Sequence, residues 1–381
     1  MGAIPGVGGA PGGSAPGTPP YIMTDPSQVA LGNASVLLHN GKEVFEEVDM
    51  RIAGRDSSVD LIISRRHISR LIRGDSLFGP SWSFNLDQSV KVSPLFELNF
   101  RGFGRTDRFE FDNPTGKYLS EQGRFGIVDW DGTLNSTLTV RRRGGTKLVY
   151  DLDNGQAKIK EIVSPNNNKI VFVYETIQVQ GLDYERLDYI VESYGRQVDF
   201  IYDTPTSTLV KTIKDFADRE VNYEYDAKDR LISVTAPEVA STSGINDFTD
   251  SGAGLKKKSY TYHADLDLET LLTGVVYPNQ NHPTSGAIGA TRYAWTYEED
   301  DQSIFYACVK THTIGNTTVS SDLAAGGTYT YEYAQVAGST PNDANPNNAV
   351  IETKVLHKRV DPTYRVGGSG YLVFRAQDEV K

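Results

Sequence analysis

Apolar and polar residues alternate along most of this chain at the two-residue spacing of β-strands. Residues 42–52 alternate loosely, and residues 59–63 form a short β-branched run between polar neighbours. Side chains two residues apart share one face of a strand, so these patterns predict half-buried strands. The best helical candidate, residues 265–272, has no apolar face longer than two turns. The body of the chain, from about residue 24, is therefore predicted to be all-β.

One motif recurs: a Tyr that follows apolar or aromatic residues at two-residue spacing and, in all but the last run, precedes an acidic or polar residue. The runs are Leu148–Asp151, Ile170–Glu175, Val198–Asp203, Val221–Asp226, Tyr260–His263, Tyr293–Glu298 and Tyr329–Ala334. The last Tyr of each run follows the previous one by 24, 28, 23, 37, 35 and 36 residues. Each unit is predicted to be a strand, a turn and a second strand. Antiparallel β-hairpins of this kind cannot be stable singly and stack into an elongated or curved sheet.

The strand ends carry turn residues. Asp203 and Asp226 each follow a strand-ending Tyr, where a carboxylate can accept nearby backbone N–H groups in an Asx-turn. Asp153-Asn154-Gly155 is a hairpin signal directly after the strand that ends near Tyr150. One face of each strand is aromatic and the other mixed or polar, which suits a sheet with one packed side. Alternation alone does not decide which face points inward.

Residues 225–232, Tyr-Asp-Ala-Lys-Asp-Arg-Leu-Ile, resemble the YD repeat of the Rhs family, Tyr-Asp-x-x-Gly-Arg-Leu, with Asp229 at the usual Gly. Residues 150–155 are a looser copy, and Gly195-Arg196 follows the same order. The repeat residues are Tyr150, Asp151, Tyr174, Tyr202, Asp203, Tyr225, Asp226, Arg230 and Leu231. Upstream, Asp25-Pro26, Gly32-Asn33, Asp49, Gly54-Arg55, Arg65 and residues 78–82 with Gly79 and Trp82 resemble the segment before the Rhs repeats. Ser81 replaces the usual Gly before that Trp.

The resemblance covers roughly residues 25–235 and implies a β-sheet wound into a hollow shell, as in Rhs toxins, Tc-toxin BC components and teneurins. In the toxins of this family the shell encloses a C-terminal toxin. Twelve of the first twenty residues are Gly or Pro, so residues 1–23 are expected to be a disordered Gly/Pro linker. With the resemblance, the expected organisation continues with an N-terminal Rhs-type segment (24–120), YD-repeat hairpins (121–240) and degenerate Tyr-rich hairpins (241–381). The chain is expected to be a truncated or N-terminal part of such a shell, with a toxin cargo or further shell repeats as partners.

Composition and charge argue against some classes of function. The chain has 38 Lys and Arg against 49 Asp and Glu, and the net charge of −11 argues against a general nucleic-acid binder. No apolar stretch approaches the roughly 18 residues of a membrane-spanning helix, and the N-terminus lacks the features of a Sec signal. The resemblance implies a secreted or cell-surface bacterial protein, exported by a route that this sequence does not show.

No chemical motif stands out. Cys308 is the only cysteine, so internal disulfides and Cys-based zinc sites are excluded, and its neighbours in sequence are not electropositive. Asp129-Trp130-Asp131-Gly132 lacks the further oxygen ligands of a calcium loop and is better explained as a hairpin turn. The six histidines form no close pair, and Glu298-Glu299-Asp300-Asp301 is typical of a solvated turn. No cofactor, metal site or catalytic residue is expected.

Two functions remain open. The first is a non-catalytic structural segment of an Rhs-type shell or extracellular scaffold. The second is a module that binds carbohydrate or a cell-surface glycan through exposed aromatic residues such as Trp295 and Tyr297. The two differ in whether the aromatic face is packed or exposed.

Overall fold

The protein, seen in a computed structural model, folds almost entirely into antiparallel β-strands. The structure describes residues 34–38, 40–70, 76–102, 105–120, 126–142, 144–237, 257–277, 291–314, 327–335, 351–358 and 371–375. Its helical elements within these ranges are two 3-10 turns, η1 (Ser57–Val59) and η2 (Leu266–Leu268). The all-β prediction is confirmed, and η2 lies in the segment that was the best helical candidate.

Four strands form a small sheet, here called the inner sheet, in the order β1-β2-β3-β4. Their bounds are β1 (Ala34–Leu37), β2 (Lys42–Ile52), β3 (Leu61–Ile68) and β4 (Trp82–Phe84). Every residue of β3 is buried, including two arginines and a histidine. A strand buried on both faces must pair its charged side chains internally, and this requirement shapes the site described below.

The remaining strands form a second sheet, here called the outer sheet, in which each strand pairs with the next along the chain. Its first half comprises β5 (Ser89–Val92), β6 (Leu98–Gly102), β7 (Arg105–Asp112), β8 (Lys117–Ser120), β9 (Gly126–Asp129), β10 (Thr137–Arg142), β11 (Lys147–Asp151), β12 (Gln156–Val163), β13 (Lys169–Val179) and β14 (Leu182–Val191). The second half comprises β15 (Gln197–Tyr202), β16 (Val210–Lys214), β17 (Glu220–Tyr225), β18 (Leu231–Thr235), β19 (Lys257–Tyr262), β20 (Leu272–Val276), β21 (Thr291–Tyr297), β22 (Val309–Ile314), β23 (Gly327–Gln335), β24 (Ile351–Lys358) and β25 (Tyr371–Arg375). All seven Tyr-containing runs of the sequence lie in strands up to their last Tyr.

The outer sheet forks at β12. One edge of β12 pairs with β11, while the other pairs with β5 over residues 156–158 and with β13 over residues 161–163. The pairing of β12 with β5 closes strands β5 to β12 into a ring. Strands β13 to β25 continue as a sheet that is open within the described residues, where β25 pairs with β24 alone. Aromatic side chains pack inside this ring of strands, where the centroids of the Phe100 and Phe109 phenyl groups are 5.1 Å apart.

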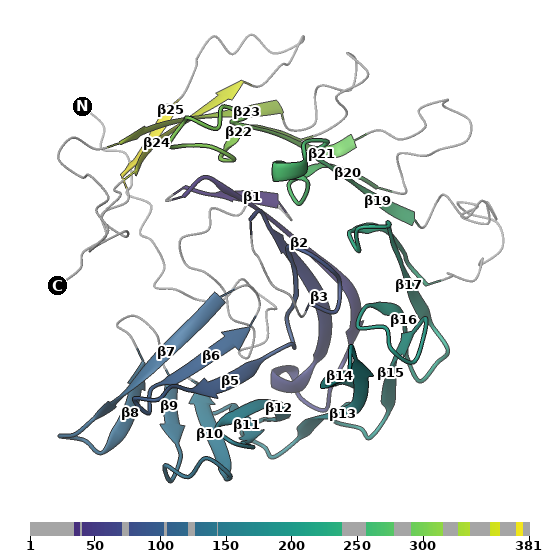
Figure 1. Ribbon diagram of the computed structural model, residues 1–381. Helices are drawn as coiled ribbons and strands as arrows, with labels where there is room; N and C mark the ends of the chain where they lie inside the picture. Colours follow the sequence, from purple (N-terminus) through teal and green to yellow (C-terminus); the bar gives the residue numbers. More distant parts are fainter. Residues whose placement is uncertain are drawn as a thin grey trace, which may run out of the picture.

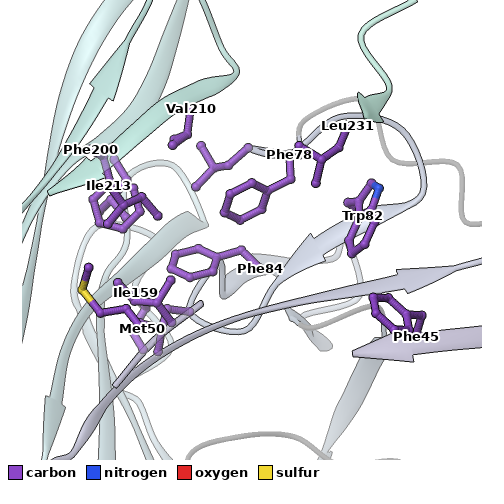
Figure 2. Packing of buried hydrophobic residues seen from close by; sticks show 14 of the residues in the cluster. Phe45, Met50, Phe78, Trp82, Phe84, Ile159, Phe200, Val210, Ile213 and Leu231 are labelled. Carbon is purple, nitrogen blue, oxygen red and sulfur yellow. The ribbon is translucent and has the colours of Figure 1, made fainter. Parts of the chain in front are cut away.

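The open part of the outer sheet follows an arc, and the inner sheet lies on its concave side (Figure 1). Strands β15 and β17 share one burial pattern, in which Val198 and Phe200, like Val221 and Tyr223, face the core. Inner and outer side chains meet in one contiguous cluster, with Phe78 and Phe84 close to Phe200, Val210 and Leu231 (Figure 2). The aromatic face therefore points inward, and in the described residues it packs on the inner sheet instead of facing the empty interior expected of a hollow shell.

Some sequence predictions fall outside the described residues. They are the Gly/Pro linker of residues 1–23 and the family signals at Asp25-Pro26 and Gly32-Asn33. In the described part of the chain, no helix is long and apolar enough to cross a membrane.

Candidate functional site

The recurring tyrosines mark an irregularity in the sheet. At Tyr150, Tyr174, Tyr202, Tyr225, Tyr262 and Tyr297 the register with the following strand shifts directly before the tyrosine. The residues paired with these tyrosines are, in order, Ile159, Leu187, Val210, Leu231, Leu272 and Val309. A bulge of this kind bends a strand and increases its twist, so a bulge in each repeat gives the sheet a repeated curvature.

The hydroxyl of Tyr150 donates to Gln88 Oε1 at 3.4 Å. From Tyr174 to Tyr333, the hydroxyl of the last tyrosine in each run instead reaches back by one repeat. It donates a hydrogen bond to the carbonyl of the apolar residue that pairs with the preceding tyrosine. The bonds run from Tyr174 to Ile159 (2.9 Å), Tyr202 to Leu187 (2.6 Å), Tyr225 to Val210 (2.8 Å), Tyr262 to Leu231 (2.8 Å), Tyr297 to Leu272 (2.6 Å) and Tyr333 to Val309 (2.7 Å). We call this series the tyrosine ladder. Burial raises the pKa of Tyr174 and Tyr225 well above the usual range, so these hydroxyls remain donors.

The turn after Tyr225 has the geometry that the YD motif predicts. One oxygen of Asp226 accepts the backbone N–H of Lys228 (2.9 Å) and of Arg230 (3.0 Å), and the other accepts Arg230 Nε (2.7 Å). Although burial opposes ionisation, the contacts with Arg230 hold the pKa of Asp226 below its usual range. Asp229 has a φ of 62°, the left-handed conformation that favours the family's glycine. The side chain of the following Leu231 is buried, and its backbone carbonyl accepts a hydrogen bond from the hydroxyl of Tyr262.

Two further turns repeat this geometry at the opposite ends of the strands. Glu192 accepts the N–H groups of Tyr194 and Arg196, and Asp215 accepts those of Ala217 and Arg219. Sequence reasoning noted Gly195-Arg196 but missed the turn at Asp215. The common signal is an acid followed four residues later by an arginine, with a positive φ between them at Gly195 or Asp218.

The predicted role of Asp203 in a turn is not found. Asp203 is exposed, and within the described residues its carboxylate accepts no hydrogen bond from the β15–β16 turn, which closes instead from Ser207 N–H to Thr204 O. Asp151 ends β11 and pairs with Lys160 and the hydroxyl of Thr137. The hairpin at Asp153–Gly155 is confirmed, since Asn154 and Gly155 both have positive φ.

Gly79 joins the upstream segment to a repeat turn. Its φ is +85°, and a Cβ at this position would lie 2.1 Å from the carbonyl oxygen of Asp229. No side chain fits in that space. Next to it, Tyr225 also donates to Leu77 O at 3.3 Å. The upstream segment is thus packed directly against the turn of the YD motif.

Asp49, Arg65 and Trp82 meet at the centre of the contact between the sheets. Arg65 and Asp49 form a two-point ion pair, with Nη2 to Oδ1 at 2.8 Å, and their side chains are 0% and 1% exposed. Tyr223 of β17 donates to Asp49 at 2.9 Å, and Arg65 donates to Tyr260 of β19 at 3.0 Å. Although burial opposes the charged form, Asp49 holds the pKa of Arg65 above its usual range.

Aromatic rings surround this ion pair. The guanidinium carbon of Arg65 lies 4.8 Å from the ring centroid of Trp82, 5.6 Å from that of Tyr260, 5.7 Å from that of Tyr223 and 5.8 Å from that of Phe78. Trp82 Nε1 in turn donates to the hydroxyl of Tyr262 at 2.9 Å. The upstream family residues and the YD tyrosines therefore form one buried cluster, which neither pattern predicts alone.

A second buried pair lies beside the first. His67 Nδ1 is 2.7 Å from a carboxylate oxygen of Glu43, and His67 Nε2 is 3.1 Å from Thr270 O. Because a carbonyl only accepts hydrogen bonds, Nε2 of His67 carries a proton. A second proton lies between Nδ1 of His67 and the carboxylate of Glu43. Burial raises the pKa of Glu43 despite the opposing effect of His67.

Further polar contacts continue along the line where the two sheets meet, here called the seam. They join Glu47 to Lys258 (2.8 Å) and Tyr277 (2.9 Å), Arg55 to Ser193 (2.8 Å), Asp56 to Ser164 (2.9 Å) and Asn168 (2.7 Å), and Gly41 O to Val309 N (2.9 Å). Cys308 lies at one end of the seam. Its neighbours in sequence are not basic, but the positive charges of Arg70 and Lys42 lie near it in the fold and favour a lower pKa of its thiol. Burial outweighs them and raises the pKa of the thiol to about 11.

The aromatic face is not available for sugar binding. Trp295 and Tyr297 are each 2% exposed, and Trp295 stacks on His312 inside the core. Asp131 accepts Thr133 N–H within a hairpin loop, and Glu298 likewise accepts Asp300 N–H in a loop. In the part of the chain that the structure describes, no group of three or more His, Cys, Asp or Glu side chains could hold a metal ion.

Comparisons with known proteins identify one family model, the domain of unknown function DUF6531, over residues 33–106. This range contains Asp49, Arg65, Gly79 and Trp82. No curated protein matches the chain. Among solved structures, the chain is similar to TcdB2-TccC3, with a TM-score of 0.31, 11% identity and coverage of 93% of this chain and 21% of that one. It is also similar to the Photorhabdus luminescens Tc holotoxin pore, with a TM-score of 0.30, 10% identity and coverage of 95% and 20%. The chain spans about a fifth of the length of these structures.

Proposed function

We propose that this chain is a non-catalytic structural segment of an Rhs-type β-shell, in which the outer sheet forms wall and the inner sheet braces it. The observation that carries the proposal is the tyrosine ladder. One hydroxyl per repeat couples each hairpin to the previous one, and one bulge per repeat bends the sheet in the same place. Repeats with nearest-neighbour contacts of this kind suit an extended wall.

The buried charges favour bracing over catalysis. Asp49 and Arg65 are enclosed by aromatic rings and by each other, so a substrate could not reach them without unfolding the seam. The partners we propose are a C-terminal toxin cargo or further shell repeats. We place the protein outside the cell or at its surface, in keeping with the Rhs resemblance of its sequence.

Limited proteolysis tests this function on the polypeptide encoded by the complete reading frame that contains this chain. We expect the segments that follow the repeats to resist protease in the native protein and to become sensitive when Gly79→Ala disturbs the seam. Gly116→Ala serves as the control, because a Cβ there meets nothing within 4 Å. Equal cleavage in the wild type and in the Gly79→Ala variant would argue against enclosure.

A further inference from the structure

We propose that a groove on the outer face of β9 to β11 binds a carboxylate-bearing saccharide, such as a uronate unit of a polysaccharide. The groove has a volume of about 490 Å³ and is lined by β9, the loop of residues 130–136, β10 and the start of β11. Its volume lies within the range of about 300–1,000 Å³ that is typical of small-molecule sites. It lies in the ring formed by β5 to β12, apart from the seam, and is independent of the proposed shell function.

Two cations lie side by side at one end of the groove. Arg141 of β10 and Lys147 of β11 are directly opposite each other in the strand pair. Like charges in this position destabilise a sheet, so their presence calls for an anion. Asp129 accepts only the Nε hydrogen of Arg141, at 2.6 Å, while a guanidinium carries five N–H donors. Among the residues described, no acidic side chain is within ion-pair distance of Lys147.

An indole ring lies at the other end. Trp130 packs on Tyr118 with ring centroids 5.5 Å apart, and its Nε1 donates to Thr133 O at 3.0 Å and to Ser136 Oγ at 3.1 Å. These contacts hold the ring in place before any ligand arrives, which lowers the entropic cost of binding. A fixed aromatic ring that lines a groove can pack against the C–H face of a pyranose.

Between the two ends lie oxygen atoms suited to sugar hydroxyls. Thr137, Thr139 and Asp131 line the groove. Hydrogen bonds from Thr133 hold the pKa of Asp131 below its usual range, so its carboxylate is an acceptor at neutral pH. Asp129 pairs with Arg141 and Asp131 with Thr133 and Ser136, so Lys147 is the groove cation that has no acidic partner within ion-pair distance among the described residues. A sugar unit with several hydroxyls and a single carboxylate therefore fits the groove better than a phosphate with two charges.

Calorimetric titration of the whole chain with trigalacturonate tests the proposal. We expect saturable binding in the wild type and about tenfold weaker binding in Lys147→Gln, the loss of one charge-assisted contact. Trp130→Ala should weaken binding to a similar extent, whereas Trp130→Phe, which keeps a ring, should retain most of it. Lys211→Gln is the matched control, since Lys211 is an exposed lysine of the same sheet away from the groove.

Neutral and inorganic probes separate the alternatives. Galactotriose should bind at least about tenfold more weakly than trigalacturonate, because it lacks the carboxylates. Equal affinity for the two sugars, tighter binding of inorganic phosphate, or no saturable binding of trigalacturonate would each overturn the proposal. Trigalacturonate could also bind with unchanged affinity to Lys147→Gln, Trp130→Ala and Trp130→Phe. That result would place the site elsewhere and would also overturn the proposal.

Discussion

Arg65 and Asp49 are charged residues that the fold removes almost completely from water. Such a transfer costs several kcal/mol per ion and is offset only when the partners have good geometry and further hydrogen bonds. Here the carboxylate also receives Tyr223, and the guanidinium reaches Tyr260 and several aromatic faces. Because these partners come from different strands of both sheets, the pair specifies how the sheets are docked.

Arg65→Met tests this ion pair. Leaving Asp49 charged and without its partner in the core should lower the free energy of unfolding by about 3–5 kcal/mol, measured by urea denaturation. The double variant Asp49→Leu/Arg65→Met should lose less than the sum of the two single variants, because it leaves no unpaired charge. Additive losses would show that the pair is not coupled.

His312 gives the stability of the protein a pH dependence. It is fully buried, neither ring nitrogen has a hydrogen-bond partner among the described residues, and burial lowers its pKa from 6.5 to about 4. His312 takes up a proton near pH 6.5 in the unfolded chain but only near pH 4 in the folded protein. Stability should therefore be complete above about pH 7 and decline as the pH falls towards 4, by about 3 kcal/mol at about 1.4 kcal/mol per pH unit.

His312→Phe isolates this contribution from that of the carboxylates. Urea denaturation of the wild type and the variant at pH 7.5 and at pH 4 should show a smaller loss in the variant. Parallel losses in the two proteins would contradict the assignment of this pH dependence to His312.

At the scale of elements, the fold depends on turns with left-handed residues and on tight contact between them. The turns at Glu192, Asp215 and Asp226 share one geometry, although only the last carries the full YD motif. Asp commonly makes side chain to backbone hydrogen bonds of this type, and Glu192 makes them here as well. This is why the turns outnumber the motifs visible in the sequence.

Gly79→Ala should be among the most damaging small substitutions at this scale. A left-handed non-glycine residue costs about 1–2 kcal/mol, and the overlap with Asp229 O adds to it, for a total of about 3 kcal/mol or more. Gly116→Ala, with a φ of +64° and open space around its Cβ, should cost only about 1 kcal/mol. Thermal or urea denaturation measures both, and equal losses would mean that the contact with Asp229 is unimportant.

At the scale of the whole molecule, the two sheets share a single core. Buried side chains of the inner sheet, of the ring and of the arc belong to one cluster, and Leu37, Val44 and Ile68 of the inner sheet form a second, small one. The seam adds hydrogen bonds from the inner sheet to strands and turns of the outer sheet between the end of β12 and β22. The inner sheet is therefore a brace for the arc, and neither sheet has a complete core of its own.

Hydrogen exchange at increasing urea concentrations tests this shared core. Backbone amides of β3 and of β17 should become exposed at the same urea concentration, because opening one sheet removes the core of the other. Arg65→Met should shift both to lower urea together. Exchange of β17 well before β3 would show that the arc opens independently of the inner sheet.

The sequence by itself determined the strands, the repeat and the turn of the YD motif, because alternation and turn chemistry are local properties. Residues 42–52 and, up to their last Tyr, all seven Tyr-containing runs lie in strands. It also indicated Asp49, Arg65, Gly79 and Trp82 as a group, but only by resemblance. Only the tertiary structure decided that these residues meet Tyr223, Tyr260 and Asp229, and that the aromatic face points inward. Those contacts join residues far apart in the chain, and their partners depend on register and curvature, which a two-residue alternation does not encode.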